Sequence, residues 1–301
     1  MFYQCSANGN TPFPPLHIPF NLKLYDTMKH IYRISVIALA TLFALPAAAQ
    51  APTDGSIKDN RTNPDVFFLE MGDAPNSLEL LPGPPSAESV QFMYDKARYD
   101  WGKSIRKTER GEQAFRDARV EGQNLPDAYS EAFGVYISPE NTPEIYRLIV
   151  GMREDAGDLA TREAKQFYNR PRPYAFFGED TCNPEQQAEL STNGSYPSGH
   201  SSLGWATALI LAELNPDRQD EILERGFQMG ESRVICGYHF QSDVDAGRIT
   251  GSGVVARLHA DPNFTTQLAT AKKEFAKLKK DGKVKEGKRP QVAHGFREPS
   301  K

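Results

Sequence analysis

The chain of 301 residues has little cysteine, little net charge and few long apolar runs. Its three cysteines exclude a scaffold held together mainly by disulfides. Beyond residue 50 no apolar stretch approaches the roughly 20 residues that a membrane-spanning helix needs, which excludes an integral membrane enzyme. The formal net charge of −4 gives no reason to expect nucleic acid or an anionic membrane as a partner. The length suffices for a full hydrophobic core.

Metal-binding motifs are missing as well. The sequence has no H-E-x-x-H, no paired C-x-x-C and no Asp-rich loop. We therefore expect no metal and no other cofactor. Lysine and arginine side chains can neutralise an anionic substrate in place of a metal.

The first 50 residues have the form of an export signal behind an unpatterned stretch. Residues 28–33 are basic, residues 34–45 are apolar, and small residues precede a cleavage point after Ala49. A buried core helix is the alternative, but it would need neither the basic start nor the Ala-x-Ala end. We expect residues 28–49 to be a signal peptide that begins at Met28, and residues 1–27 to be a non-native upstream start.

Two cysteines remain once this leader is removed, because Cys5 lies within it. An exported protein folds in an oxidising compartment, which favours a disulfide between Cys182 and Cys236. The alternative is a pair of buried thiols. A bridge here would tie together two parts of the candidate site described below.

The rest of the chain predicts an all-α fold, a compact single-domain helical bundle. Prolines interrupt residues 50–85, which predicts an irregular N-terminal arm. No sustained strand alternation appears. Apolar residues at helical spacing predict helices over 86–101, 109–119, 126–133, 142–170, 203–214, 216–229, 243–258 and 262–280. In the first of these, Val90, Met93, Tyr94, Ala97 and Trp101 share one face. The basic segment 281–301 is expected to be a flexible tail.

Three short segments carry the residues with chemical potential. They follow the pattern K-x6-RP, then PSGH, then SR-x5-H-x3-D, in that order along the chain. Three cations at one pocket would repel one another unless an anion binds between them, and the arginine fork matches phosphate oxygens. A lone cation would indicate only a solvated surface charge, but the joint pattern predicts an anion site. Its candidate phosphate-binding residues are Lys165, Arg172, Ser198, Gly199 and Arg233.

The two histidines of the pattern have different neighbours, which fits two different roles. His239 and Asp243 are four residues apart, so the carboxylate can fix the imidazole tautomer and leave the other ring nitrogen as a nucleophile. His200 follows Ser198 and Gly199 at the start of an apolar helix, where an anion is favoured. It is the candidate general acid for the leaving oxygen. The alternative is two structural histidines.

These segments resemble the superfamily that unites type 2 phosphatidic acid phosphatases with vanadium haloperoxidases. More closely, residues 194–200 and 232–245 are similar to the signatures of bacterial class A non-specific acid phosphatases. The family usually has threonine where this chain has Ser201. The resemblance covers roughly residues 65–260 and implies an acid phosphatase domain, here 86–280, that is all-α. It also implies a periplasmic enzyme that needs no metal and assembles as a dimer or a larger homo-oligomer.

The family's roles carry over to matching positions. The resemblance implies that His239 forms a phosphohistidine, that Asp243 orients it, and that His200 is the acid. Glu154 lies eleven residues before Lys165 and could face the same pocket, although an exposed surface glutamate is the alternative.

The sequence therefore predicts a metal-independent acid phosphatase with a broad range of phosphomonoesters, such as nucleotides, sugar phosphates and aryl phosphates, and with phosphotransferase activity. An apyrase-like nucleotide phosphohydrolase on the same site is the nearest alternative, because the leaving-group pocket cannot be derived from sequence. A vanadate-dependent haloperoxidase would usually be much longer. A non-catalytic phosphate-binding protein would need neither histidine.

Overall fold

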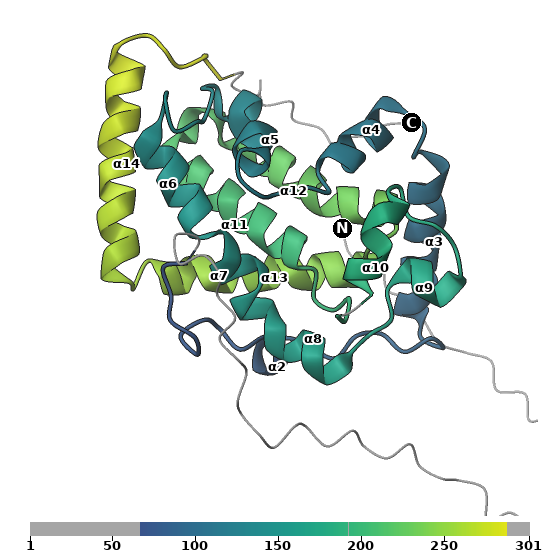
Figure 1. Cartoon of the computed structure of the whole chain (residues 1–301). Coiled ribbons are helices and arrows are strands. Elements are labelled where there is room, and N and C mark those ends of the chain that lie inside the picture. The colour runs from purple at the N-terminus through teal and green to yellow at the C-terminus, as the bar shows by residue number, and fades with distance from the viewer. Residues whose placement is uncertain (1–66, 192, 288–301) are drawn as a thin grey trace, which may run out of the picture. The chain divides into compact units, whose positions relative to one another are not determined.

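The computed structural model describes residues 67–191 and 193–287. The described residues form helices and contain no strand, so the expected all-α class is confirmed (Figure 1). The expected upstream start, signal peptide and first part of the arm lie outside the described residues.

The helices are named here in chain order. They are α2 (Ser77–Leu80), α3 (Val90–Ser104), α4 (Glu109–Arg116), α5 (Asn124–Phe133), α6 (Pro143–Gly151), α7 (Arg153–Gly157), η2 (Leu159–Thr161), α8 (Arg162–Tyr168), α9 (Pro173–Phe177), η3 (Pro184–Gln186), α10 (Gln187–Leu190), α11 (Gly199–Leu214), η4 (Pro216–Arg218), α12 (Gln219–Cys236), α13 (Gln241–Leu258) and α14 (Pro262–Lys280).

Helix α11 is the centre of the bundle and packs on both α12 and α13 (Figure 1). Its apolar residues are buried along almost its whole length, which fits a helix that is hydrophobic on all sides. The crossing with α13 is close: a Cβ at Gly247 would stand 2.5 Å from the Ser198 carbonyl oxygen, so only glycine fits there. This contact brings the start of α13 to the start of α11. Helix α14 packs against α6 at the far side of the core.

Helix α3 presents its apolar face to solvent. Val90 is 78% exposed, Met93 69% and Tyr94 58%, so the face that the helical spacing singles out is not the buried one. On the opposite face Phe92 packs on Phe176 and Tyr99 stacks on Phe177. Asp95 is buried between them and forms hydrogen bonds with Arg170 and with the segment that begins α13. The buried face of this helix therefore combines aromatic packing with a buried carboxylate.

The continuous helix expected over 142–170 is wrong. The chain runs instead as α6, α7, η2 and α8, with breaks at Met152 and Asp158, each of which directly follows a glycine. Glycine in a helix interior weakens it, which explains both positions. Helix α8 ends at Asn169, in the left-handed region at φ 39°. The chain therefore turns sharply between Lys165 and Arg172, and the two side chains do not share one helical face.

The start of the C-terminal tail is anchored. The Lys285 N–H donates to the Gly134 carbonyl at 2.9 Å, and Arg218 Nη1 donates to the Glu286 carbonyl at 2.7 Å. Residues 281–287 are thus held by α5 and η4 and are not loose, while 288–301 lie outside the described residues. In the part of the chain that is described, no helix has the length and apolar character needed to cross a membrane.

Candidate active site

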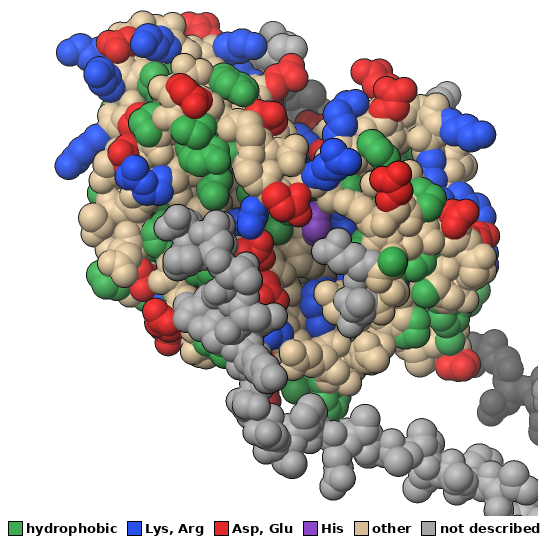
Figure 2. Space-filling view, viewed as in Figure 1, with side chains coloured by type: hydrophobic (Ala, Val, Ile, Leu, Met, Phe, Trp, Pro, Cys, Tyr) green, Lys and Arg blue, Asp and Glu red, His purple; other side chains and the backbone are tan. Residues whose placement is uncertain are grey.

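The three motif segments meet where helices begin and end. Helix α11 starts, α12 ends and α13 starts at this place, and the Ser198 N–H donates to the Asp243 carbonyl at 2.9 Å. From α8, the Lys165 ammonium donates to the Gly194 carbonyl at 3.0 Å. Figure 2 shows a hollow in the molecular face in which a histidine side chain lies among basic and acidic side chains.

The predicted cations lie together, and Asp243 is a nearby carboxylate that acts on both Lys165 and Arg172. Arg233 is 1% and Arg172 4% exposed, and among the described residues neither they nor Lys165 forms an ion pair. Burial, with Arg172 and Arg233 nearby, lowers the pKa of Lys165 to about 7. Burial also lowers the pKa of Arg233 to about 9. Buried charges of one sign are costly unless a partner neutralises them, so the arrangement favours a bound anion.

Arg233 has donors to spare. Its guanidinium lies over the Tyr238 ring, 4.2 Å from the centroid, and its Nε and Nη1 find no hydrogen-bond partner within the described ranges. Arg172 is instead held in place: Nε donates to the Leu190 carbonyl at 2.7 Å and Nη2 to Asn193 Oδ1 at 2.5 Å. Buried donors are rarely left unpaired, so those of Arg233 are suited to ligand oxygens.

The tautomer of His239 follows from its neighbours. Arg172 Nη1 lies 3.0 Å from Nε2 of the ring, and because arginine can only donate, Nε2 must be the unprotonated nitrogen. The ring proton is then on Nδ1, which is 3.6 Å from Asp243 Oδ2, slightly beyond hydrogen-bond distance. Burial, followed by the three cations, holds the pKa of His239 well below its usual value. The ring is therefore neutral and its lone pair is on the side of the cations.

His200 is fixed by the segment that follows α4. Its Nε2 lies 3.2 Å from the Ala118 carbonyl, which only accepts, so Nε2 carries a proton. Any second, transferable proton must be on Nδ1. Burial first, and then Arg233, Arg172 and Lys165, hold the pKa of His200 well below its usual value. A phosphate group among these cations would offset that effect.

The start of α11 combines a cap with a close backbone approach. Ser198 caps the helix and accepts from the Ser201 N–H at 3.3 Å and from the Ser201 hydroxyl at 2.9 Å. A Cβ at Gly199 would stand 2.4 Å from the Gly157 carbonyl oxygen, so α7 can pack here only on glycine. The free N–H groups of this helix start favour an anion.

Glu154 lies next to this contact and not against the histidines. Its Oε1 accepts from Arg153 Nε at 2.8 Å, and its Oε2 lies over Gly157. Burial raises the pKa of Glu154, and Arg153 opposes that rise. No hydrogen bond joins it to a candidate catalytic residue in the described part of the chain.

Two buried residues in contact with the site escaped the sequence analysis. Arg170 Nη1 donates to Asp243 Oδ1 at 2.5 Å, and Arg170 Nη2 donates to Asp95 Oδ2 at 2.9 Å. Arg170 lies in the run R-P-R-P of residues 170–173, whose prolines predict only the end of a helix. Asp95 carried no sequence signal for a site residue, because the apolar spacing of α3 predicted the opposite face of this helix to be buried.

A disulfide joins Cys182 to Cys236, as expected, and closes a separation of 54 residues. The Cys182 N–H also donates to the Cys236 carbonyl at 3.0 Å. Cys236 ends α12, the helix of Arg233, and Cys182 begins the loop whose Leu190 and Asn193 hold Arg172. The bridge thus connects the supports of two site arginines.

We expect the double variant Cys182→Ser/Cys236→Ser to unfold at lower temperature, with a loss of about 2–4 kcal/mol in unfolding free energy. Its KM for an aryl phosphate should rise, because the loop that holds Arg172 is no longer tied to α12. Thermal unfolding and steady-state kinetics measure both. A reductant should produce the same changes in the wild type and none in the double variant. An unchanged KM in both the double variant and the reduced wild type would refute the link between the disulfide and the position of Arg172.

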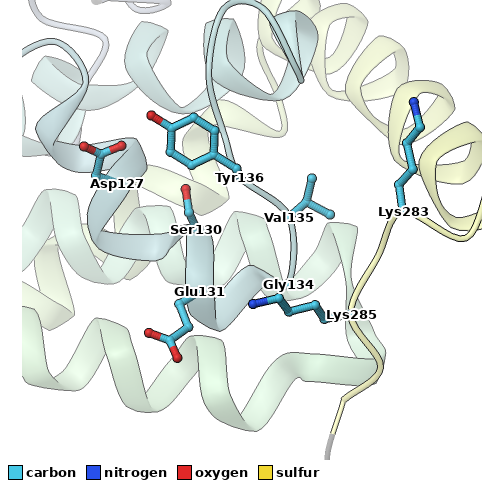
Figure 3. A pocket seen from close by; sticks show the side chains of 8 residues that line it. All are labelled: Asp127, Ser130, Glu131, Gly134, Val135, Tyr136, Lys283 and Lys285. Carbon is cyan, nitrogen blue, oxygen red and sulfur yellow. The ribbon is translucent and has the colours of Figure 1, made fainter.

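A separate pocket of about 500 Å³ lies between α5 and the anchored tail (Figure 3). Its lining mixes acidic side chains, such as Asp127 and Glu131, with Lys283 and Lys285, and none of the candidate site residues is among them. In the described part of the chain no group of His, Cys, Asp and Glu could hold a metal ion.

An all-α bundle whose buried cations surround two histidines belongs to the class of proteins that bind phosphate groups. Comparison with known proteins makes this specific. The PAP2 superfamily model matches residues 151–266. The chain is 56% identical over 222 residues to the non-specific acid phosphatase of Providencia stuartii, covering 74% of this chain and 90% of that one. It is 42% identical over 208 residues to the non-specific acid phosphatase of Salmonella typhimurium, covering 69% and 83%. The Zymomonas mobilis acid phosphatase is 36% identical over 203 residues, 67% of this chain and 76% of that one.

The chain therefore belongs to the non-specific acid phosphatases of the PAP2 superfamily. It is an enzyme, an acid phosphatase.

Proposed function

We propose that this phosphatase hydrolyses phosphomonoesters through a phosphohistidine on His239. In the first step the Nε2 lone pair attacks phosphorus, the bond to the leaving oxygen breaks, and His200 gives its Nδ1 proton to that oxygen. The ring of His239 becomes positively charged, and Asp243 stabilises it. The leaving group departs as a neutral alcohol.

In the second step water replaces the alcohol. Neutral His200 now accepts a proton from the water as its oxygen attacks phosphorus, and the bond from phosphorus to Nε2 breaks. Inorganic phosphate and free enzyme are restored. An added alcohol can take the place of the water, so we also propose phosphotransfer to alcohols.

The observation that carries this proposal is the position of the unprotonated Nε2 of His239, which points to the cations. Lys165, Arg172 and Arg233 bind the phosphate oxygens, with the Ser198 hydroxyl and the Gly199 N–H completing the cradle. These donors neutralise the charge of the phosphoryl group as it transfers, the part that metal ions have in other phosphatases.

The wider setting is also a proposal. We infer a broad range of phosphomonoesters, because the groups assigned above bind the phosphoryl oxygens and the leaving oxygen, which all phosphomonoesters share. We infer export to the periplasm, supported by the disulfide between Cys182 and Cys236. Assembly as a homo-oligomer stays a prediction, supported by the exposed apolar face of α3.

Hydrolysis of p-nitrophenyl phosphate at mildly acidic pH in the presence of EDTA tests the function directly. We expect full activity with the chelator, since the cradle is built from side chains and N–H groups. Rapid quenching during turnover should trap a phosphoenzyme that is labile to acid and stable to base. Activity without any such species would contradict the phosphohistidine, and loss of activity in EDTA would contradict metal independence.

A further inference from the structure

A buried charge network lies behind Asp243, outside the steps proposed above. It joins Asp95 of α3, Arg170 of the turn before α9, and Asp243 of α13. Their side chains are 1%, 8% and 0% exposed. At such burial each charge depends on its protein partners and not on water.

Arg170 bridges the two carboxylates. Its two terminal nitrogens bind one carboxylate each, Asp243 Oδ1 at 2.5 Å and Asp95 Oδ2 at 2.9 Å. The guanidinium also lies over the Phe240 ring, 4.2 Å from the centroid. Held at both ends and on one face, the planar fork has a single orientation, and it imposes that orientation on the Asp243 carboxylate.

Asp95 fixes the other side of the same arrangement. Its Oδ1 accepts from the Ser242 N–H at 2.8 Å, and its Oδ2 accepts from the Ser242 hydroxyl at 2.5 Å. Arg170 Nη1 donates to that hydroxyl at 2.8 Å. Asp95 therefore holds both Arg170 and the residue directly before Asp243.

The second oxygen of Asp243 faces the nucleophile. Asp243 Oδ2 accepts from the Phe240 N–H at 2.8 Å and lies 3.6 Å from His239 Nδ1. Because Oδ1 is bound by Arg170, the carboxylate cannot rotate without breaking that bond. The direction of Oδ2 toward the ring is thus set from behind.

We propose that Arg170, held by Asp95, is a positioning residue of the phosphatase reaction that acts through Asp243 on His239. This role rests on the phosphohistidine mechanism proposed above. Arg170 orients the carboxylate and favours its ionised form. Two carboxylates around one guanidinium also leave a net negative charge behind the ring, which stabilises the positive ring formed when His239 is phosphorylated.

The electrostatics agree with this role. Burial raises the pKa of Asp243 to about 6, and Arg170 is the strongest influence that lowers it. The titratable and charged groups that face Asp243 are Arg170, Asp95, Lys165, Arg172, Tyr196 and His239. Without Arg170 the carboxyl would take up a proton at higher pH. The decline of activity at low pH, which accompanies protonation of Asp243, would then begin at higher pH.

Three substitutions test the proposal. Arg170→Gln removes the charge, Arg170→Lys keeps the charge but cannot bind both carboxylates, and Asp95→Asn keeps the shape of the support. With p-nitrophenyl phosphate we expect kcat to fall about 10- to 100-fold, as for other groups that orient a functional residue, with KM changed less than about threefold. In Arg170→Gln the decline of kcat at low pH should begin at higher pH. Arg170→Lys, which keeps the charge, should show a smaller fall in kcat and a smaller shift of this decline than Arg170→Gln.

A matched control comes from the same helix as Asp95. Arg98 donates to Gln241 Oε1 and Glu231 Oε1, both at 3.0 Å, so it too links α3 to α12 and α13 without touching Asp243. Arg98→Gln should lower thermal stability and leave kcat and the pH profile unchanged. An equal fall of kcat in Arg98→Gln would overturn the proposal, because any loosening of α3 would then suffice.

The decisive measurement is a double-mutant cycle. In an Asp243→Asn background, Arg170→Gln should reduce kcat by less than about twofold, because Arg170 acts through the carboxylate that is already lost. The same factor in both backgrounds would overturn the proposal. If Arg170→Gln does not fold, Arg170→Lys and Asp95→Asn test the proposal in its place. An unchanged kcat and an unchanged pH profile in both variants would overturn the proposal.

Failure of the mechanism beneath the proposal is visible separately. A wild-type enzyme that forms the acid-labile phosphoenzyme while Arg170→Lys and Asp95→Asn keep full kcat refutes only the positioning role. A wild-type enzyme that never forms the phosphoenzyme refutes the mechanism, and the positioning role with it.

Discussion

Replacing His239 by alanine should lower kcat about 10⁴- to 10⁶-fold, the loss expected when a covalent nucleophile is removed from a preorganised site. This corresponds to about 5–8 kcal/mol of transition-state stabilisation. The cations remain in place, yet they can only bind the phosphate and cannot open the covalent route. Kinetics with p-nitrophenyl phosphate measure the loss, and acid-labile phosphoenzyme should be undetectable.

Phosphate binding separates this effect from unfolding. Without the imidazole Arg172 keeps its hydrogen bonds to Leu190 and Asn193, and Lys165 keeps its bond to Gly194, so His239→Ala should still be stabilised against heat by inorganic phosphate. His259→Ala is the matched control, because that side chain is 38% exposed and pairs with Glu213 outside the site. It should keep kcat within about twofold. Substantial activity in His239→Ala would refute the role of His239 as the nucleophile.

The sequence predicted the helical elements best where one strong pattern acts alone. Helix α14 begins at Pro262 and ends at Lys280, as expected, because a proline start and a steady apolar period agree there. The prediction of one helix over 142–170 was wrong because the apolar period continues across two glycine breaks. Periodicity indicates which residues are buried but not whether the helix is continuous. The orientation of helix α3 was predicted wrongly for a different reason: its buried face mixes Phe92 and Tyr99 with the charged Asp95, so apolar spacing does not mark it.

The site was predictable to the extent that it lies in local motifs. The spacing of His239 and Asp243 falls within one short segment, and the pairing of Cys182 with Cys236 needed only an even count. The support behind the motif could not be found in this way. Asp95 lies far from Asp243 in sequence, and only the packing of α3 on α13 brings them to the same guanidinium. Contacts of this kind depend on tertiary structure and leave no local pattern.

Replacing His200 by glutamine should reduce kcat/KM about 10²- to 10⁴-fold for a sugar phosphate, whose alkoxide is a poor leaving group. The reason is specific to the proton on Nδ1. Without it the leaving oxygen must depart as an anion, which a sugar hydroxyl tolerates badly and a dinitrophenol tolerates well. The same variant should therefore lose much less kcat/KM with 2,4-dinitrophenyl phosphate. This ratio reports the phosphorylation step and not the later attack by water, in which His200 acts as a base. Measuring both substrates with both enzymes gives the contrast, and an equal loss for the two would refute the acid role.

The pH profile provides a second test of the same proton. Burial and three cations hold the pKa of His200 well below its usual value, so in the free enzyme the protonated form increases as the pH falls. For the sugar phosphate, kcat/KM of the wild type should therefore rise toward acidic pH until Asp243, whose pKa burial raises to about 6, begins to be protonated. At still lower pH His239, whose pKa is lowered for the same reasons as that of His200, loses its lone pair. In His200→Gln the decline on the alkaline side should disappear while the acidic decline remains. An acid and a nucleophile in one cation-lined pocket thus explain why the enzyme should work under acidic conditions.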